Sequence, residues 1–155
     1  MKPRSSVLFL ALFVLAAATC FAANDSLNGT WKLNESKSKI PAGAPKNLTV
    51  VYEAAGDSTK VTIEGTAPDG SPTHSEWTGK FDGKDYPSTG NPNEDMRSGK
   101  MINDTTYDVQ SKKGGKVILT AHVVVSPDGK SRTVTVHGTD SKGKKYTSVA
   151  VYDKQ

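Results

Sequence analysis

Three histidines and a few carboxylates are the side chains of this sequence most able to do chemistry. His74 and Glu76 are two residues apart, so in a strand both point to one face, where they could act as general acid and base. His122 and His137 lie in neighbouring runs that we predict to be paired strands, and two imidazoles on one face could share a metal ion. Both kinds of chemistry depend on which face of its strand carries the histidine.

The sequence carries no motif that assigns such chemistry. It has no G-x-S-x-G, H-E-x-x-H, P-loop or G-x-G-x-x-G spacing. A catalytic zinc needs three protein ligands, and the paired histidines supply only two. Trp77 and Phe81 share the face opposite His74 and Glu76 and are better candidates for the interior. We therefore predict no catalytic residue, no metal and no cofactor; an enzyme is an alternative only if His74 or Glu76 faces inward.

The first residues have the three parts of a secretory signal peptide. A short basic head precedes an apolar run at 7–18, and small residues follow. The apolar run is too short for a transmembrane helix, which needs about 20 residues. Cleavage after Ala22 assigns 1–22 to the signal peptide and 23–155 to one secreted or periplasmic domain. The alternatives are an N-terminal membrane anchor and a lipidated Cys20.

The mature domain is close to neutral, although the whole chain has a sequence pI of about 9.1. Removing 1–22 leaves eighteen bases and sixteen acids, and 112–155 carries nine of those bases against three acids. We interpret this basic third as solubilising lysines at hairpin tips rather than as a binding patch. The near-neutral charge and the core-like positions of the aromatic residues argue against nucleic acid as a partner. Without a cysteine in the mature domain, packing has to supply the stability.

Short runs rich in Val, Thr, Ile and Tyr fill the mature sequence, and none has the apolar spacing of an amphipathic helix. Turn pairs such as Gly114-Gly115 and Asp128-Gly129 separate the runs and are strong hairpin signals. Longer polar loops occupy 34–47 and 88–95. The predicted strands are 29–33, 48–55, 60–66, 73–81, a short 86–87, 96–102, 105–110, 117–126, 131–139 and 146–152.

Consecutive hairpin strands make an antiparallel meander, and a meander of this length has two free edges to protect. Closing the sheet into an up-and-down barrel removes both edges. We therefore predict an all-β fold, in which an antiparallel up-and-down meander of eight to ten strands closes into a barrel. A two-sheet sandwich is the alternative, but it needs long crossover connections, and the sequence offers few long loops.

The hairpin around Asp128-Gly129 allows its register to be predicted. With these residues at the turn, Val123 lies opposite Val134 on an apolar face that must be the inside of the barrel. The other face carries threonines together with His122 and His137, which lie diagonal to each other. We expect this second face to be exposed to solvent.

The first predicted strand, Gly29-Thr30-Trp31-Lys32-Leu33, resembles the G-x-W motif that opens the first strand of lipocalins. Over its whole length it is similar to the first strand of fatty-acid-binding proteins, which also belong to the calycin superfamily. Ala150-Val151-Tyr152-Asp153-Lys154 is similar to the last strand of that family, which runs Arg-x-Tyr followed by charged residues. The chain also resembles small secreted bacterial proteins with this opening and ending. The resemblance implies a lipocalin-like barrel that encloses a small ligand.

The chain departs from fatty-acid-binding proteins in two places. Residues 34–47 stand where that family inserts a helix-turn-helix lid, and they are too few and too rich in Pro and Gly for two helices. Ala150 stands where the family carries a carboxylate-binding arginine, whereas Tyr152 corresponds to the tyrosine partner of that arginine. The resemblance therefore implies that the charge-assisted contact to a fatty-acid carboxylate is missing.

We predict an exported, monomeric, non-enzymatic barrel that binds a small apolar or amphipathic molecule. Trp31 is expected to plug one end of the barrel, where its large apolar area contributes most. The residues expected to face the ligand are Val50, Tyr52, Ile63, Trp77, Phe81, Leu119, Val123, Val134, Val136 and Tyr152. The alternative is an envelope interaction or structural module whose barrel core is filled by these same side chains.

Overall fold

The computed structural model describes residues 26–140 and 142–155. The predicted signal peptide, 1–22, and Cys20 lie outside the described residues. The elements in chain order are β1 (Gly29–Leu33), the 3-10 helix η1 (Glu35–Lys37), β2 (Lys46–Ala55), β3 (Ser58–Thr66), β4 (Pro72–Gly79), β5 (Asp82–Thr89), β6 (Met96–Asn103), β7 (Thr106–Lys113), β8 (Lys116–Val125), β9 (Ser131–Thr139) and β10 (Lys145–Lys154). In the described ranges no helix combines the length and the apolar character needed to cross a membrane.

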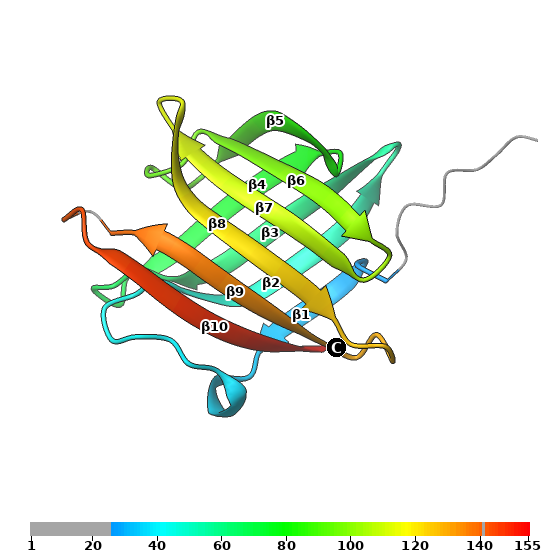
Figure 1. Cartoon of the computed structure of the whole chain (residues 1–155), viewed down its shortest axis with the longest axis horizontal. Coiled ribbons are helices and arrows are strands. Elements are labelled where there is room, and N and C mark those ends of the chain that lie inside the picture. Colours follow the sequence, from blue (N-terminus) through cyan, green and yellow to red (C-terminus); the bar gives the residue numbers. More distant parts are fainter. Residues whose placement is uncertain (1–25, 141) are drawn as a thin grey trace, which may run out of the picture.

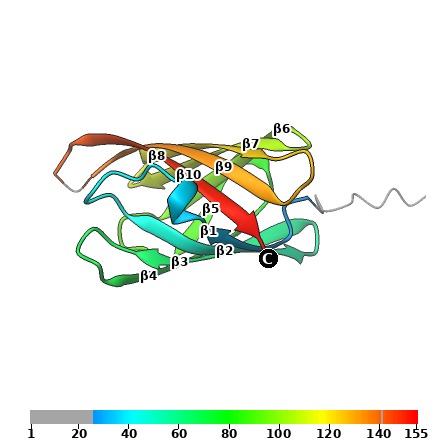
Figure 2. The ribbon, with the colours of Figure 1, turned by 90° about the horizontal axis from the view of Figure 1, so that it is seen from below.

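The strands form one closed antiparallel barrel. Each strand pairs with its neighbours along the chain, and β1 pairs with both β2 and β10, which closes the sheet. Figures 1 and 2 show β6–β9 as one layer and β2–β4 as the other, with β1, β5 and β10 joining the two. The predicted all-β meander closed into a barrel is confirmed, and closure removes the free strand edges that an open sheet would expose.

The register predicted for the β8–β9 hairpin is also confirmed. Val123 pairs with Val134, and His122 pairs with Thr135. The turn forms because Gly129 adopts a φ of 68°, which side chains with a Cβ rarely tolerate. Because side chains alternate between the two faces of a strand, this register sends Val123 and Val134 into the barrel and leaves His122 outside.

Trp31 closes the end of the barrel at which β1 begins. Its side chain is 0% exposed, and its Nε1 donates a hydrogen bond of 2.9 Å to the backbone carbonyl of Leu27. Gly29 has a φ of 118°, which lets the chain turn from Leu27 into β1. The Lys154 ammonium lies 5.2 Å from the centre of the Trp31 ring and donates to the carbonyl of Ser26. This arrangement is the plug expected from the sequence.

The connection from β1 to β2 carries no helical lid. Its only helix is the single turn of η1, where the Asn34 side chain accepts a hydrogen bond from the backbone N–H of Lys37. The segment then pairs with the edge of β10 beyond β1, because the backbone groups of Lys39 and Val149 exchange two hydrogen bonds. The predicted loop is therefore confirmed, and at Lys39 it continues the sheet beside β10.

Two neighbouring segments differ from the prediction. The predicted strand 73–81 ends early, because β4 stops at Gly79, and Phe81 lies in the connection that follows. A Cβ on Gly79 would lie 2.5 Å from the Trp77 ring and 2.7 Å from the Tyr86 ring, so only glycine fits there. The predicted two-residue strand is the eight-residue β5. The sequence did not predict the full length of β5, because its polar residues and its proline lack the apolar alternation of a half-buried strand.

Candidate ligand-binding interior

The residues predicted to face a ligand all point into the barrel. Those buried in the apolar core are Val50, Tyr52, Ile63, Trp77, Val123 and Tyr152. Phe81 and Val134 are partly buried and pack against that core. Leu119 and Val136 are half-buried at positions that pair with inward-facing residues of the neighbouring strands. The structure therefore gathers the predicted set on one surface, the inner wall of the barrel.

The inner wall also holds Arg132, which the sequence prediction did not select. Arg132 is 3% exposed and lies on β9, paired with Val125 of β8 and Tyr152 of β10. The register that placed Val123 and Val134 inside places Arg132 inside as well, since positions two residues apart share a face. Strand periodicity in the sequence therefore indicates that Arg132 faces inward, although a charged residue is not expected there.

Aromatic side chains surround the Arg132 guanidinium. Its central carbon lies 4.9 Å from the ring centres of Trp31, Tyr52 and Tyr152. Its Nη1 donates to the Tyr107 hydroxyl at 3.0 Å, and the hydroxyls of Tyr107 and Tyr52 share a hydrogen bond of 2.9 Å. Cation–π contacts and the charged hydrogen bond both stabilise the guanidinium in this position.

No carboxylate balances the charge of Arg132 in the described ranges. The buried acid there is Glu94, and it pairs with a different arginine. The Arg132 Nε has no hydrogen-bond partner among the described residues. A buried charge without a counter-ion costs several kcal/mol, and the unbonded Nε–H is a donor that an anion could use.

Two of the tyrosines around Arg132, Tyr107 and Tyr152, have raised pKa values and are protonated at ordinary pH. Burial raises the pKa of Tyr107 well above its usual value, and Tyr52 adds to this while Arg132 opposes it. Burial likewise raises the pKa of Tyr152 to about 12, again against the effect of Arg132. Burial lowers the pKa of Arg132, but the tyrosine side chains outweigh burial and the net pKa is raised. The hydroxyls of Tyr107 and Tyr152 therefore do not offset the positive charge of Arg132.

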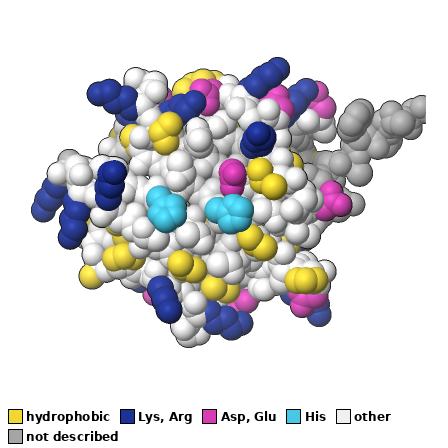
Figure 3. Space-filling view, viewed as in Figure 1, with side chains coloured by type: hydrophobic (Ala, Val, Ile, Leu, Met, Phe, Trp, Pro, Cys, Tyr) yellow, Lys and Arg dark blue, Asp and Glu magenta, His cyan; other side chains and the backbone are white. Residues whose placement is uncertain are grey.

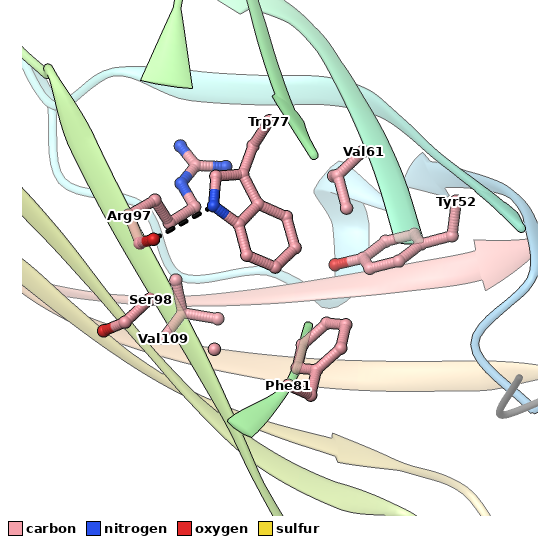
Figure 4. A pocket seen from close by; sticks show the side chains of 8 residues that line it. Tyr52, Val61, Trp77, Phe81, Arg97, Ser98 and Val109 are labelled. Atoms are coloured by element: carbon pink, nitrogen blue, oxygen red, sulfur yellow. Dashed lines mark hydrogen bonds between the residues drawn. The ribbon is translucent and has the colours of Figure 1, made fainter. Parts of the chain in front are cut away.

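A small cavity lies beside this cluster. Its volume is about 30 Å³, and it is lined by Tyr52, Val61, Trp77, Phe81, Arg97, Ser98, Gly99 and Val109 (Figure 4). That space suits a water molecule or two, whereas pockets for small organic ligands have roughly 300–1,000 Å³. An organic ligand therefore needs a side chain to move out of the barrel.

Phe81 is the side chain best placed to move. Its ring meets the rings of Trp77 and Tyr107 edge-on, with centres 5.6 Å and 5.1 Å away, and it lies against Gly99, where a Cβ would be 2.6 Å from the ring. Phe81 belongs to no strand, and the strands it connects, β4 and β5, share two residue pairs where β3 and β4 share eight. Few backbone hydrogen bonds therefore have to break when this wall opens.

The first acid–base candidate lies on the outside of the barrel. The side chains of His74 and Glu76 are 50% and 42% exposed, and His74 Nδ1 lies 2.6 Å from the Glu64 carboxylate. Ser75 and Trp77, which alternate with them along β4, are the residues that face inward. His74 and Glu76 therefore do not form an acid–base pair in the interior.

The second pair of histidines also lies outside. His122 of β8 and His137 of β9 alternate with inward-facing residues of their strands, so both lie on the outer face. Figure 3 shows two histidines near each other on the outer surface of the barrel. Their Nδ1 atoms are hydrogen-bonded to Asp108 at 2.7 Å and to Thr147 at 3.0 Å. Within the described ranges, no group of three or more His, Cys, Asp or Glu side chains is arranged to hold a metal ion.

Comparison with known proteins supports the fold assignment. No family model matches the chain, and no curated protein matches it. Among solved structures, the chain is similar to a fatty acid binding protein of Schistosoma mansoni in complex with arachidonic acid, with a TM-score of 0.52 and 17% sequence identity. The similarity covers 84% of this chain and 97% of that chain. The resemblance to calycin barrels is therefore confirmed for the fold.

Proposed function

We propose that this barrel binds a small amphipathic molecule with an anionic group, such as an alkanoic acid, in its interior. The observation that carries the proposal is the buried guanidinium of Arg132, which has no carboxylate partner and one unbonded N–H among the described residues. A protein gains little stability from an unpaired buried charge, so its retention is explained by a ligand of opposite charge. The solved barrel to which this chain is similar holds a fatty acid, which supports the same proposal.

An arginine lies next to Tyr152, although the resemblance to fatty-acid-binding proteins implied that it would be missing. Ala150 occupies the expected position on β10 and pairs with Val134. The neighbouring strand supplies Arg132 instead, directly opposite Tyr152. An arginine and a tyrosine therefore meet across two strands, where the resemblance led us to look for them along one strand.

The proposed ligand has its anionic group at Arg132 and its apolar part in the enlarged cavity. The Arg132 N–H groups and the hydroxyls of Tyr52 and Tyr107 can donate hydrogen bonds to a carboxylate. Val61 and Trp77 line the cavity beside these hydroxyls and would contact the apolar part (Figure 4). Movement of Phe81 away from Gly99 would provide the remaining space.

Affinities for matched acids and alcohols test this proposal. Straight-chain alkanoates and the alcohols of equal length are titrated against protein that holds 1-anilinonaphthalene-8-sulfonate, and release of this fluorescent anion is measured. A hydrogen bond to a charged group contributes about 1.5–3 kcal/mol, so the acids should bind at least tenfold more tightly than the alcohols. Equal affinities, or no saturable release by any acid, would overturn the proposal.

Two variants assign the selectivity to Arg132. Arg132→Met is expected to bind the acid and the alcohol with the same low affinity. Lys130→Met is the matched control, because Lys130 is an exposed base two residues away on the same hairpin. It should keep the selectivity of the wild type. A loss of selectivity in both variants would show that general surface charge is responsible.

A barrel with a filled core is the second candidate, and the cavity of only about 30 Å³ favours it. In that case the protein is a structural or interaction module of the envelope, and its outer surface does the work. It predicts that neither acids nor alcohols bind at any chain length. Crosslinking to an envelope partner, together with an empty ligand screen, would support this candidate.

We also propose that the protein is exported, on the basis of the signal-like sequence at 1–22. Mass spectrometry of the protein from the extracytoplasmic fraction of its own host should give a chain that starts at Ala23. An intact Met1 in the cytoplasmic fraction would contradict export, and a lipid-modified Cys20 would replace secretion by membrane anchoring.

A further inference from the structure

A second, partly buried arginine points into the barrel, and the chain itself supplies its counter-ion. The side chains of Arg97, on β6, and Glu94, in the connection before it, are 13% and 4% exposed. Arg97 Nη2 donates to Glu94 Oε2 at 2.9 Å. The second contact, Nε to Oε1, is also 2.9 Å long. The carboxylate therefore meets the guanidinium through both of its oxygens, as the carboxylate of a ligand would.

The backbone on both sides of Glu94 is fixed. Gly90 begins the connection with a φ of 86°, and a Cβ there would lie 2.6 Å from the carbonyl oxygen of His74, so another residue would not fit. The Glu94 N–H donates to the carbonyl of Asn91. Asp95 then accepts a hydrogen bond of 2.8 Å from the N–H of Gly114. The conformation of the connection therefore does not depend on the side-chain contact between Glu94 and Arg97.

Arg97 forms part of the cavity wall. Figure 4 shows its guanidinium beside the indole of Trp77, whose Nε1 donates to the Arg97 carbonyl at 3.0 Å. Phe81, the side chain whose movement would enlarge the cavity, lines the same space. An anion that left Arg97 would therefore leave a positive charge facing this space.

We propose that Arg97 is a second anion-binding group of the barrel and that Glu94 occupies its site until a small carboxylate displaces it. The Glu94 carboxylate is the chain's own stand-in for such a ligand. The proposal rests on the proposed function for the nature of the natural ligand, whereas the anion site at Arg97 can be tested independently. Because an incoming carboxylate has to compete with Glu94, the pair lowers the affinity for anions and makes their entry depend on release of Glu94.

The ion pair of Glu94 and Arg97 contributes little to the stability of the fold, so stability does not explain why it is present. Desolvation of two buried charges offsets most of their mutual attraction, and apolar side chains of similar size often serve a core equally well. A displaceable internal ligand explains why Glu94 pairs with an arginine that lies in the wall of the cavity.

Chemical rescue of Glu94→Ala tests the anion site. The variant leaves the Arg97 guanidinium buried, unpaired and beside an empty space, and its melting temperature should fall by about 10 °C. Sodium propionate should restore at least about half of this loss, whereas propionamide or sodium chloride at equal concentration should not. If the variant is unfolded in buffer, propionate is expected to induce folding, followed by the same circular dichroism signal.

Two further variants are matched controls. Glu94→Ala combined with Arg97→Met removes both charges and should fold without responding to propionate. Glu76→Ala removes an exposed carboxylate that also pairs with a base, Lys60, and it should not respond either. A Glu94→Ala protein that propionate fails to stabilise, or stabilises no more than Glu76→Ala, would overturn the proposal.

The role of Glu94 as a competitor is tested with Glu94→Gln. The neutral side chain should raise the affinity for an alkanoate by about tenfold and leave the affinity for the matching alcohol unchanged. An equal change for acid and alcohol would show a merely structural effect and contradict the competition. Propionate rescue of Glu94→Ala and tighter acid binding by Glu94→Gln, together with equal affinities of the wild type for acids and alcohols, would support the anion site and refute the proposed function.

Discussion

The variant Arg132→Met removes a buried charge and keeps an unbranched side chain among the same aromatic rings. In the wild type, Arg132 is 3% exposed and touches three of these rings at 4.9 Å. If the guanidinium is retained to bind an anion, its removal should abolish binding and leave the fold intact. If it is retained for the fold, its removal should unfold the protein.

The expected stability change follows from opposing contributions. The variant loses one hydrogen bond of a charged donor to Tyr107, about 1.5–3 kcal/mol, and cation–π contacts of about 0.5–2 kcal/mol each. It gains relief from the desolvation of an unpaired charge, several kcal/mol, and sulfur–aromatic contacts of about 0.3–1.5 kcal/mol. The Tyr107 hydroxyl keeps its bond to Tyr52, so no buried polar atom is newly orphaned. The free energy of unfolding should therefore change by less than about 2 kcal/mol.

Arg132→Met should change the affinity for an alkanoate far more than it changes the stability of the protein. Loss of two charge-assisted hydrogen bonds to a carboxylate corresponds to about 3–6 kcal/mol, or more than a hundredfold in affinity. Urea denaturation followed by tryptophan fluorescence measures the stability, and calorimetric titration with an alkanoate measures the binding. A variant that loses more than about 4 kcal/mol of stability, or that binds the acid as tightly as the wild type does, would refute the reasoning.

Three further predictions concern the barrel around this site. Trp31→Ala should lower the free energy of unfolding by about 3–5 kcal/mol, because it removes the fully buried plug; an unchanged urea midpoint would contradict that role. The pKa of Tyr152 is about 12 in the folded chain against roughly 10 in an unfolded one, so its contribution is present below pH 10 and is lost as the pH rises towards 12. Stability measured across this range should fall about 2–3 kcal/mol less in Tyr152→Phe than in the wild type, and parallel curves would argue against a shifted pKa. Phe81→Ala should lower stability by about 3–4 kcal/mol yet increase affinity for alkanoates, since the space is already open; weaker binding would show that Phe81 contacts the ligand instead of blocking its site.

Local signals were sufficient to predict the fold. Turn pairs such as Asp128-Gly129 specify tight hairpins, and alternating apolar residues fix which side of each strand faces inward, so the β8–β9 register could be predicted residue by residue. β5 could not be predicted in full, because Asp82-Gly83 and Pro87 are typical of turns and its inner face is short. The barrel imposes an extended conformation on this segment through its pairing with β6.

The candidate site could be predicted only in its apolar part. The inward valines and aromatic residues follow from strand periodicity. Arg132 occupies an inward position of a predicted hairpin, but composition rules place arginine at the surface unless a partner is known. Two of its three ring partners, Trp31 and Tyr52, come from strands that do not pair with β9. Glu94 and Arg97 meet because a turn between β5 and β6 folds back into the barrel. No periodic pattern encodes that conformation.

The ionisation state of a bound acid tests the central claim most directly. An alkanoate labelled with carbon-13 at its carboxyl group gives a signal whose position reports protonation, and it can be followed by nuclear magnetic resonance while the pH is lowered. A carboxylate held against the buried Arg132 guanidinium should stay ionised below the pH range in which the free acid titrates, and this resistance should disappear in Arg132→Met. A bound signal that titrates as the free acid does, or that resists titration equally in Arg132→Met, would contradict the account.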